Sequence, residues 1–277
     1  MVEKHTVGNM KVTEIKSCYI GPEISPEQFI SEHFFLYLAK GKINGYDGNK
    51  KQTLHAGEYC LVIKNRLASY NKEKTENEFE KVVIIFDEVF LKNFQQKHKT
   101  TVTKFKSEKA FLKLDKSELI PSFIQSLSPY YNHSGKIDKS FADIKREELL
   151  IILLRNQPEL AGILFDYGIP EKINLEAFMN KNFRFNVSIQ RFAYMTGRSL
   201  SAFKRDFKII FNDTPNRWLV HKRLQEAYFL IDRKNKKPSE IYRDLGFEDL
   251  SHFSFAFKKQ FGQAPTELAG RKKNSSG

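Results

Sequence analysis

An internal repeat near the C-terminus constrains the fold of this chain more than any other feature of its sequence. The segment FKRDFKIIFNDTP, residues 203–215, matches the segment FSFAFKKQFGQAP, residues 253–265. The residues that recur unchanged at an offset of 50 are, in the first copy, Phe203, Phe207, Lys208, Phe211 and Pro215. A match this dense is more specific than a short motif, so we expect both copies to share one fold.

The repeat extends upstream and places a glycine between two helices in each copy. The pairs aligned at an offset of 49 are Phe192 with Ile241 and Gly197 with Gly246, which indicates a one-residue insertion at the turn. Each copy ends at Asn212 or Gly262, the residue types that best tolerate the left-handed conformation at a helix end. This order of helix, glycine turn, helix and break predicts a helix-turn-helix, present twice.

The second helix of the first copy divides into two faces by its period of 3.6 residues. The stripe expected to face inward consists of Phe203, Phe207, Ile210 and Phe211. The face expected to be exposed is polar and cationic and consists of Ser201, Lys204, Arg205 and Lys208. Ser199 stands where an N-cap is needed, so we expect the helix to begin there and its amide end to be able to bind a phosphate.

Positive charge is concentrated in the same part of the chain. Residues 172–277 contain 21 Lys and Arg against 10 Asp and Glu, whereas residues 1–171 contain 25 against 23. Most of the net charge of +13 therefore lies in the repeat region. Such segregation of charge indicates a polyanionic partner, and it favours nucleic acid over a membrane surface. The other interpretation is a lysine-rich surface that is only solvated.

Side chains of these types suit a surface that reads double-stranded DNA. Arg can pair bidentately with guanine, Lys can donate to guanine or phosphate, and Ser can bond to either. The candidates for contact with base edges are Ser201, Lys204, Arg205, Ser251, His252 and Phe255. The candidates for contact with phosphates are Ser199, Lys208, Lys258 and Lys259.

We call the second helix of each unit its reading helix, and we expect the two reading helices to differ in how they discriminate bases. The alignment pairs Ser201 with Ser251, Lys204 with Ser254, Arg205 with Phe255, and Lys208 with Lys258. The phenyl ring of Phe255 either contacts an apolar feature such as a thymine methyl or turns inward to the core, and both stay open. In either case the second unit should discriminate less by hydrogen bonding.

A helical spacer is predicted between the two units. Thr214 and Pro215 form a cap and N-terminal proline signal, and apolar residues continue the helix to about Ile231. Sixteen residues give a length of roughly 24 Å. Two reading helices held apart by this spacer can enter successive major-groove faces, which lie about 34 Å apart. If the helices are closer together than that, the DNA must bend.

The N-terminal part shows a different pattern. Residues 11–86 alternate short β-like runs with turn signals, including the turn at residues 47–49, and predict a compact antiparallel barrel or sandwich. The pattern becomes helical at Asp87, and after a strand-like run at residues 101–105 it is helical again from about Ser117. The residues expected to mark one buried face of a later helix, packed in its own domain or against another subunit, are Phe141, Ile144, Ile151 and Leu154.

The C-terminal residues resemble the AraC/XylS family of transcription regulators, from about Leu175 to Leu268. The resemblance is carried by FAYMTGRSLSAFKRDFK, TPNRWLVHKRLQEAYFLI and LGFEDLSHFSFAFKKQFGQAPTEL. It implies a sequence-specific regulator, with a leaning toward activation, that contacts RNA polymerase and inserts residues 199–211 and 250–260 into the major groove. The second unit departs from the family pattern at Tyr242 and Phe255, where a small residue and an arginine are usual.

The N-terminal part resembles, less specifically, the cupin-like sensor barrels of the same family, through HFFLYLAKG and LHAGEYCLVIK. This resemblance implies a domain that can bind a small-molecule or protein effector and can assist formation of a homodimer. His33 and His55 are isolated, so we expect no metal site, no cofactor and no enzymatic activity. Cys18 and Cys60 lie far apart and indicate neither a disulfide framework nor a zinc module.

The fold class predicted from these patterns is α+β, with an N-terminal cupin-like β-barrel and a C-terminal all-α domain of two helix-turn-helix units joined by a long helix. The expected divisions are residues 1–110 for sensing or partner binding, 111–170 for a helical linker and dimerisation region, 171–270 for DNA binding, and 271–277 for a flexible tail. Neither a signal peptide nor a membrane helix is indicated, so we expect a cytoplasmic protein. The alternatives are a sequence-indifferent architectural nucleic-acid-binding protein and a cupin enzyme fused to a DNA-binding tail.

Overall fold

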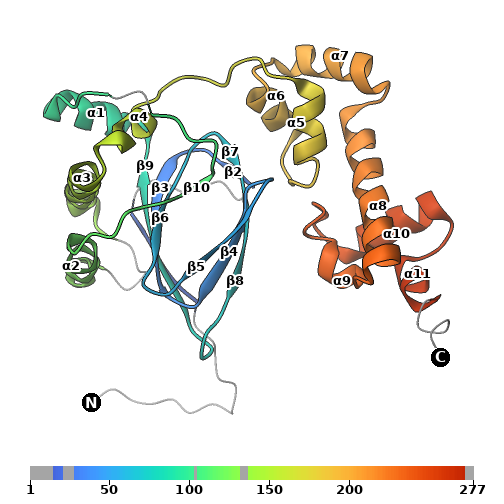
Figure 1. Cartoon of the computed structure of the whole chain (residues 1–277), viewed down its shortest axis with the longest axis horizontal. Helices are drawn as coiled ribbons and strands as arrows, with labels where there is room; N and C mark the ends of the chain where they lie inside the picture. The colour runs from blue at the N-terminus through green and yellow to red at the C-terminus, as the bar shows by residue number, and fades with distance from the viewer. Residues whose placement is uncertain (1–14, 21–27, 103–104, 132–136, 272–277) are drawn as a thin grey trace.

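The computed structural model describes residues 15–20, 28–102, 105–131 and 137–271, which form a β-rich N-terminal domain and an all-helical C-terminal part (Figure 1). The α+β fold class predicted from the sequence is confirmed. Residues 272–277 of the expected tail, and residues 11–14 of the predicted β-like pattern, lie outside the described residues.

Three sheets build the N-terminal domain. The five-stranded sheet has the order β1-β9-β3-β6-β10, the three-stranded sheet has the order β5-β4-β8, and β2 pairs with β7. The strands are β1 (Ile15–Ile20), β2 (Phe29–Ile30), β3 (His33–Lys40), β4 (Lys42–Tyr46), β5 (Lys51–His55), β6 (Tyr59–Val62), β7 (Arg66–Leu67), β8 (Ser69–Glu73), β9 (Phe79–Phe86) and β10 (Phe111–Lys113). All neighbouring pairs are antiparallel except β1 with β9, which are parallel.

The large sheet is buried on both faces, which the sequence of β9 already reflects. Successive side chains of a strand point to opposite faces. Phe79, Val83 and Ile85 belong to the apolar layer inside the domain, whereas Val82 and Ile84 pack outward among the helices. This double burial explains why FEKVVIIF reads as a nearly continuous apolar run rather than as a strict alternation.

Helices cover the outer face of this sheet (Figure 1). They are α1 (Glu88–His98), α2 (Leu119–Ser126), α3 (Lys139–Asn156) and α4 (Ala161–Leu164), with short 3₁₀ turns at Ser128–Tyr130 and Pro158–Leu160. Arg146 on α3 anchors the layer: its Nε donates to the carbonyl oxygen of Ile85 at 2.7 Å, and its guanidinium also pairs with Asp87. Asp87 in turn caps α1, where the sequence predicted the change to helix.

One expectation for this region is wrong. Phe141 and Ile144 are 45% and 61% exposed, because the face of α3 that packs inward is formed by Arg146, Leu149, Leu150 and Leu153. In the strand-like run at residues 101–105, the described residues 101, 102 and 105 form no strand, and residues 103 and 104 lie outside the described part of the chain. The strand of this region is instead β10, whose three residues complete the edge of the large sheet beside β6.

His33 begins β3 and is 1% exposed. Its Nδ1 accepts a hydrogen bond from the backbone N–H of Lys64 at 3.2 Å, so it serves as a structural residue. Burial, together with the nearby cations of Lys64 and Arg66, lowers the pKa of His33 from 6.5 to about 3. The folded domain therefore favours the neutral ring, and the associated stability is present above pH 6.5 and is lost as the pH falls toward 3.

We expect the free energy of unfolding to fall by up to about 1.4 kcal/mol per pH unit below pH 6.5 because His33 must take up a proton on unfolding. Denaturant titrations at pH 7, 5.5 and 4.5 on the unchanged chain and on His33→Gln measure this dependence. The variant should lose less stability than the unchanged chain as the pH falls. Parallel losses in the two proteins would show that His33 is not the cause.

Seven helices follow along the described C-terminal residues. They are α5 (Leu175–Asn182), α6 (Ile189–Met195), α7 (Leu200–Phe211), α8 (Pro215–Lys234), α9 (Pro238–Ile241), α10 (Leu250–Phe261) and α11 (Pro265–Arg271). Helices α6 and α7 form the first unit, α9 and α10 form the second, and α8 joins them. With 20 residues, α8 is longer than the sequence predicted and spans about 30 Å.

The sequence repeat is a structural repeat. The ring centroids of Phe203 and Phe207 are 5.6 Å apart, and those of the equivalent Phe253 and Phe257 are 5.8 Å apart. These four rings are fully buried. Both reading helices end in the left-handed conformation at the residues predicted, with φ of 51° at Asn212 and 74° at Gly262. The prediction of two equivalent helix-turn-helix units is confirmed.

Candidate DNA-binding surface

The outer face of α7 presents the polar side chains that the sequence selected. Ser201, Lys204, Arg205 and Lys208 are all exposed, on the side opposite the buried Phe203 and Phe207. The helix begins at the expected N-cap, because the side chain of Ser199 accepts a hydrogen bond from the backbone N–H of Ala202 at 3.3 Å. This face carries three cationic side chains, which suits it to an anionic partner.

An aspartate that no sequence pattern singled out, Asp206, lies beside Arg205. One carboxylate oxygen of Asp206 accepts from Arg205 at 3.3 Å, and the other accepts from Nε of Arg198 at 3.1 Å. The hydrogen bond from Arg198 holds the pKa of Asp206 below its ordinary value. Since Arg198 also donates to the carbonyl oxygens of Ile173 and Thr196, this network ties the turn of the first unit to its reading helix.

Lys208 and Lys258 occupy the same position in the two copies of the repeat, but their ammonium groups have different surroundings. The Nζ atom of Lys208 donates to the carbonyl oxygen of Asn212 at 3.2 Å and so helps to cap the end of α7. Lys258 and Lys259 are exposed at the end of α10, and within the described residues neither makes an ion pair or a side-chain hydrogen bond. Their ammonium groups are therefore free to face solvent or an anion.

The second reading helix is capped by a carboxylate. Asp249 accepts a hydrogen bond from the backbone N–H of His252 at 2.6 Å, whereas the corresponding cap of the first unit is a neutral serine. Ser251 and His252 are exposed, and Phe255 is 70% exposed. The structure thus places Phe255 outside the core, which settles one alternative that the sequence left open.

Arg223 joins the two units at the middle of α8, and sequence reasoning missed it. Its guanidinium is buried and donates to three carbonyl oxygens: Nε to Phe183 at 2.7 Å, Nη2 to Phe185 at 2.8 Å and Nη1 to Gly246 at 3.0 Å. The first two acceptors precede the first unit, and the third lies in the turn of the second. Burial lowers the pKa of Arg223 to about 10, so it stays charged near neutral pH. An arginine between Leu219 and Ala227 on an apolar helix face was the available signal.

The N-terminal domain contacts the first unit. The guanidinium of Arg191 on α6 lies 4.0 Å from the ring centroid of Phe29, and the hydroxyl of Tyr194 donates to Oδ1 of Asn65 at 3.2 Å. The backbone N–H of Asn186, just before α6, donates to Oε1 of Gln28 at 2.8 Å. Apolar residues of β2 and β7 thereby join the core of the first unit. In Figure 1, α7 and α10 lie near opposite ends of α8, so the second unit is held mainly by α8.

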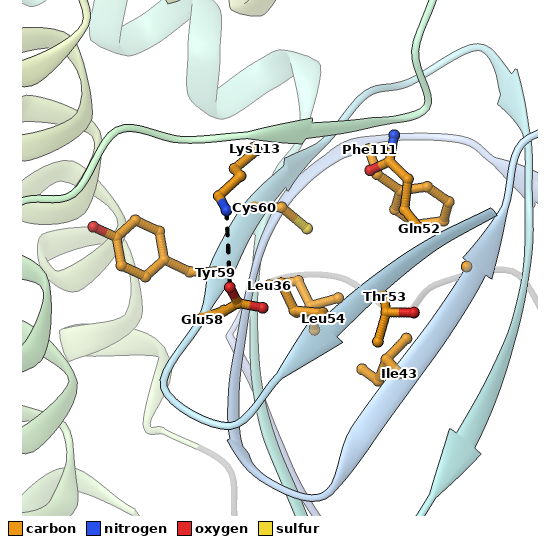
Figure 2. Close-up of a pocket in the computed structure, with 11 residues that line it drawn as sticks. Leu36, Ile43, Gln52, Thr53, Leu54, Glu58, Tyr59, Cys60, Phe111 and Lys113 are labelled. Atoms are coloured by element: carbon orange, nitrogen blue, oxygen red, sulfur yellow. Dashed lines mark ion pairs between the residues drawn. The ribbon is translucent and has the colours of Figure 1, made fainter. Parts of the chain in front are cut away.

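The N-terminal domain also contains cavities. A cavity of about 70 Å³ lies beside Leu36, Cys60 and Phe111, with the Lys113–Glu58 ion pair at 3.8 Å on its rim (Figure 2). Cys60 is a buried free thiol, and burial raises its pKa to about 12. A larger cavity of about 370 Å³ is mostly apolar, and Gln28 and Phe29, which contact the first unit, contribute to its wall.

The described part of the chain contains neither a metal-binding cluster nor a membrane-spanning helix. His33 and His55 lie at opposite ends of separate strands, and no group of three or more His, Cys, Asp or Glu within the described ranges is arranged to hold a metal ion. Among the described helices, none combines the length and the apolar character that crossing a bilayer requires.

Comparison with known protein families divides the chain in the same way. A model described as the ExsA N-terminal regulatory domain matches residues 33–163, and a model described as a helix-turn-helix domain matches residues 192–271. The first covers most of the β-rich domain and its helices. The second covers both repeated units.

Individual relatives are similar over part of their length. The chain is 24% identical over 184 residues to the virulence regulon transcriptional activator VirF of Yersinia enterocolitica, which is 61% of this chain and 66% of VirF. It is 25% identical over 127 residues to the transcriptional regulator ExsA of Pseudomonas aeruginosa, covering 45% and 46%. It is 31% identical over 120 residues to the transcriptional activator RhaS of Escherichia fergusonii, covering 43% and 42%. The chain thus spans between about two fifths and two thirds of these curated relatives.

A solved structure of apo ToxT from Vibrio cholerae is similar along most of the chain, with 15% identity, a TM-score of 0.40, and coverage of 88% of this chain and 90% of that one. An AraC-type DNA-binding regulator from Chromobacterium violaceum is 26% identical with a TM-score of 0.32, covering 35% and 87%. Together with the repeated helical units, the two family models and the transcription regulators matched in sequence show that the chain belongs to the AraC/XylS family of transcription regulators.

Proposed function

We propose that the chain is a sequence-specific DNA-binding transcription regulator that activates its targets and reads two successive major-groove faces with α7 and α10. The observation that carries this proposal is the pair of equivalent reading helices, each with exposed polar side chains, which α8 separates and Arg223 links. Two of its relatives, VirF and RhaS, are named as transcriptional activators, which supports activation.

The decisive experiment selects bound DNA from a random pool with the full-length chain. A regulator of this kind should recover one bipartite motif whose halves lie about one helical turn apart. Binding to that motif should weaken steeply with salt because lysine and arginine displace counterions from the phosphates. Recovery of unrelated sequences with equal affinity would instead favour an architectural nucleic-acid-binding protein.

Arg205→Ala is expected to weaken binding to the selected site by about 1–3 kcal/mol and to relax specificity at one base pair. Arg205 is exposed, and the carboxylate of Asp206 orients its guanidinium, which suits a bidentate contact with guanine. Fluorescence anisotropy on the selected site and on single-base-pair variants of each half measures both effects. Equal weakening on every duplex would assign Arg205 to the phosphates instead.

Lys258→Ala is expected to weaken binding by a similar factor on all sequences and to flatten the salt slope by about one unit. Its ammonium group is exposed and is not used to cap α10, unlike that of Lys208 in the first unit. Titrations of the selected duplex and a scrambled duplex at several salt concentrations give both quantities. A loss confined to one sequence would contradict the phosphate assignment.

We extend the proposal to the other partners that family membership suggests. RNA polymerase is the protein that the chain contacts when it activates transcription. The cavity of about 370 Å³ is the site for an effector, since the wall of the cavity includes residues that contact the first unit.

A second copy of the chain is the partner for the exposed Phe141 and Ile144 on α3, and sedimentation velocity tests this dimer. The chain acts in the cytoplasm without enzymatic activity, with residues 1–110 for sensing, 111–170 for linkage and 171–270 for DNA binding.

A further inference from the structure

Phe255 is an unusual phenylalanine for a packed helical domain. Along α10, Phe253 and Phe257 are fully buried, whereas Phe255, midway between them, is 70% exposed. Phe255 is two residues from Phe253 and from Phe257 and so lies about 200° around the helix from each of them. Its ring therefore cannot reach the core that these two residues fill. The domain exposes a large apolar side chain that its own packing does not need.

The face that carries Phe255 is otherwise polar and cationic. Ser251 lies four residues before it, and Lys258 and Lys259 lie three and four residues after it, so the four side chains share one side of α10. The structural repeat makes Phe255 the equivalent of Arg205 on α7. The ring therefore lies where the first unit has Arg205. The ammonium groups of Lys258 and Lys259 lie beside it and can contact phosphates.

The chemistry of the major groove restricts what a phenyl ring can recognise there. It has no hydrogen-bond donor or acceptor for the edges of guanine, cytosine or adenine, whereas the methyl group on C5 of thymine is apolar. Side-chain wedges that unstack bases act from the minor groove, and α10 is a major-groove element of the repeat. We propose that Phe255 contacts the 5-methyl group of a thymine and so gives the second unit its base preference, an inference that rests on the proposed function.

The cap of α10 supports this division of roles between the units. The carboxylate of Asp249 occupies the N-terminal end of α10 and already accepts from the N–H of His252. A negative charge there disfavours a phosphate at the helix end, which the neutral Ser199 of the first unit allows. The second helix thus offers the ring of Phe255, the hydroxyl of Ser251, the imidazole of His252 and its C-terminal lysines as contacts to DNA.

The test removes single methyl groups from the DNA. Each thymine in the second half of the selected site is replaced in turn by deoxyuridine, which keeps the pairing edge and the O4 acceptor but lacks the 5-methyl group. For the full-length chain we expect one position at which this change weakens binding roughly fourfold, as loss of one buried methyl predicts. Cytosine at that position should bind more tightly when it is 5-methylated.

Variants assign the effect to Phe255. With Phe255→Ala, deoxyuridine and thymine at that position should bind equally, because the ring that distinguishes them is gone. Phe255→Leu keeps an apolar side chain and should retain part of the preference. Arg205→Ala, the matched change on the first unit, should weaken binding overall while leaving the full methyl effect in place. Since Phe255 is outside the core, thermal unfolding of Phe255→Ala should match that of the unchanged chain.

The outcomes are separable. A methyl effect that persists in Phe255→Ala, or a variant that weakens thymine and deoxyuridine duplexes by the same factor, would overturn the proposal while leaving DNA binding intact. Absence of any methyl-sensitive position in the second half would overturn it as well. Failure of the unchanged chain to prefer any DNA sequence would contradict the proposed function itself, and the proposal for Phe255 would then be overturned with it.

Discussion

Arg223→Met is expected to lower the free energy of unfolding of the C-terminal part by about 3–5 kcal/mol, because it removes a buried guanidinium that donates to three carbonyl oxygens. It should also weaken binding to a bipartite DNA site, since Arg223 links the segment that precedes the first unit to the turn of the second. Denaturant titration followed by far-ultraviolet circular dichroism measures the first effect. Binding to full and half sites measures the second.

Arg217→Met is the matched control, because Arg217 lies on the same helix but is 83% exposed and pairs with Asp213 only at 3.7 Å. We expect this change to alter stability by less than about 0.5 kcal/mol. Arg223→Lys should recover little, since a lysine cannot direct donors to three carbonyl oxygens in the geometry of a guanidinium. If Arg217→Met and Arg223→Met destabilise equally, the role assigned to the buried arginine is wrong.

Gly197→Ala should destabilise the first unit by about 3 kcal/mol or more, for two reasons that add. Gly197 has a φ of +63°, where an L side chain is strained by about 1–2 kcal/mol. A Cβ built there would also lie 2.4 Å from the carbonyl carbon of Glu171 and 2.5 Å from the backbone nitrogen of Lys172. Backbone atoms this close cannot yield as a flexible side chain can, so the segment that enters the C-terminal part must move.

Gly262→Ala separates the two contributions. Gly262 has a similar φ of +74°, but a Cβ there meets no described atom within 4 Å. It should therefore cost only the backbone strain, about 1–2 kcal/mol. Thermal and denaturant unfolding of both variants measures the difference. Equal losses would mean that the close approach of Glu171 relaxes without cost.

The sequence predicted the elements that depend on local pattern and repetition. The boundaries of α7 followed from Ser199 and Asn212, because caps are encoded in the residues that form them. The position of Phe255 outside the core also follows from the period, once Phe253 and Phe257 are known to fill the inward stripe. Whether these surfaces contact DNA as assigned stays a prediction.

Features that depend on tertiary contacts could not be predicted in this way. The acceptors of Arg223 are backbone carbonyls 23 to 40 residues away, and carbonyl positions leave no mark in a sequence. The buried face of α3 was assigned to Phe141 and Ile144 because several faces of that helix are apolar, and only the sheet beneath it selects Leu149 and Leu153. A strand as short as β10 carries too few residues to show an alternation.

The unequal attachment of the two units has a consequence for the time course of binding. The first unit is fixed to the N-terminal domain through Arg191 and Tyr194, whereas the second is joined through α8 and Arg223. Under the proposed function, once α7 engages a half site, the 20-residue α8 presents α10 to the neighbouring groove at a high effective concentration. The second half site should therefore lengthen the residence of the protein on DNA, while the rate of first encounter is set by the charge of the whole domain.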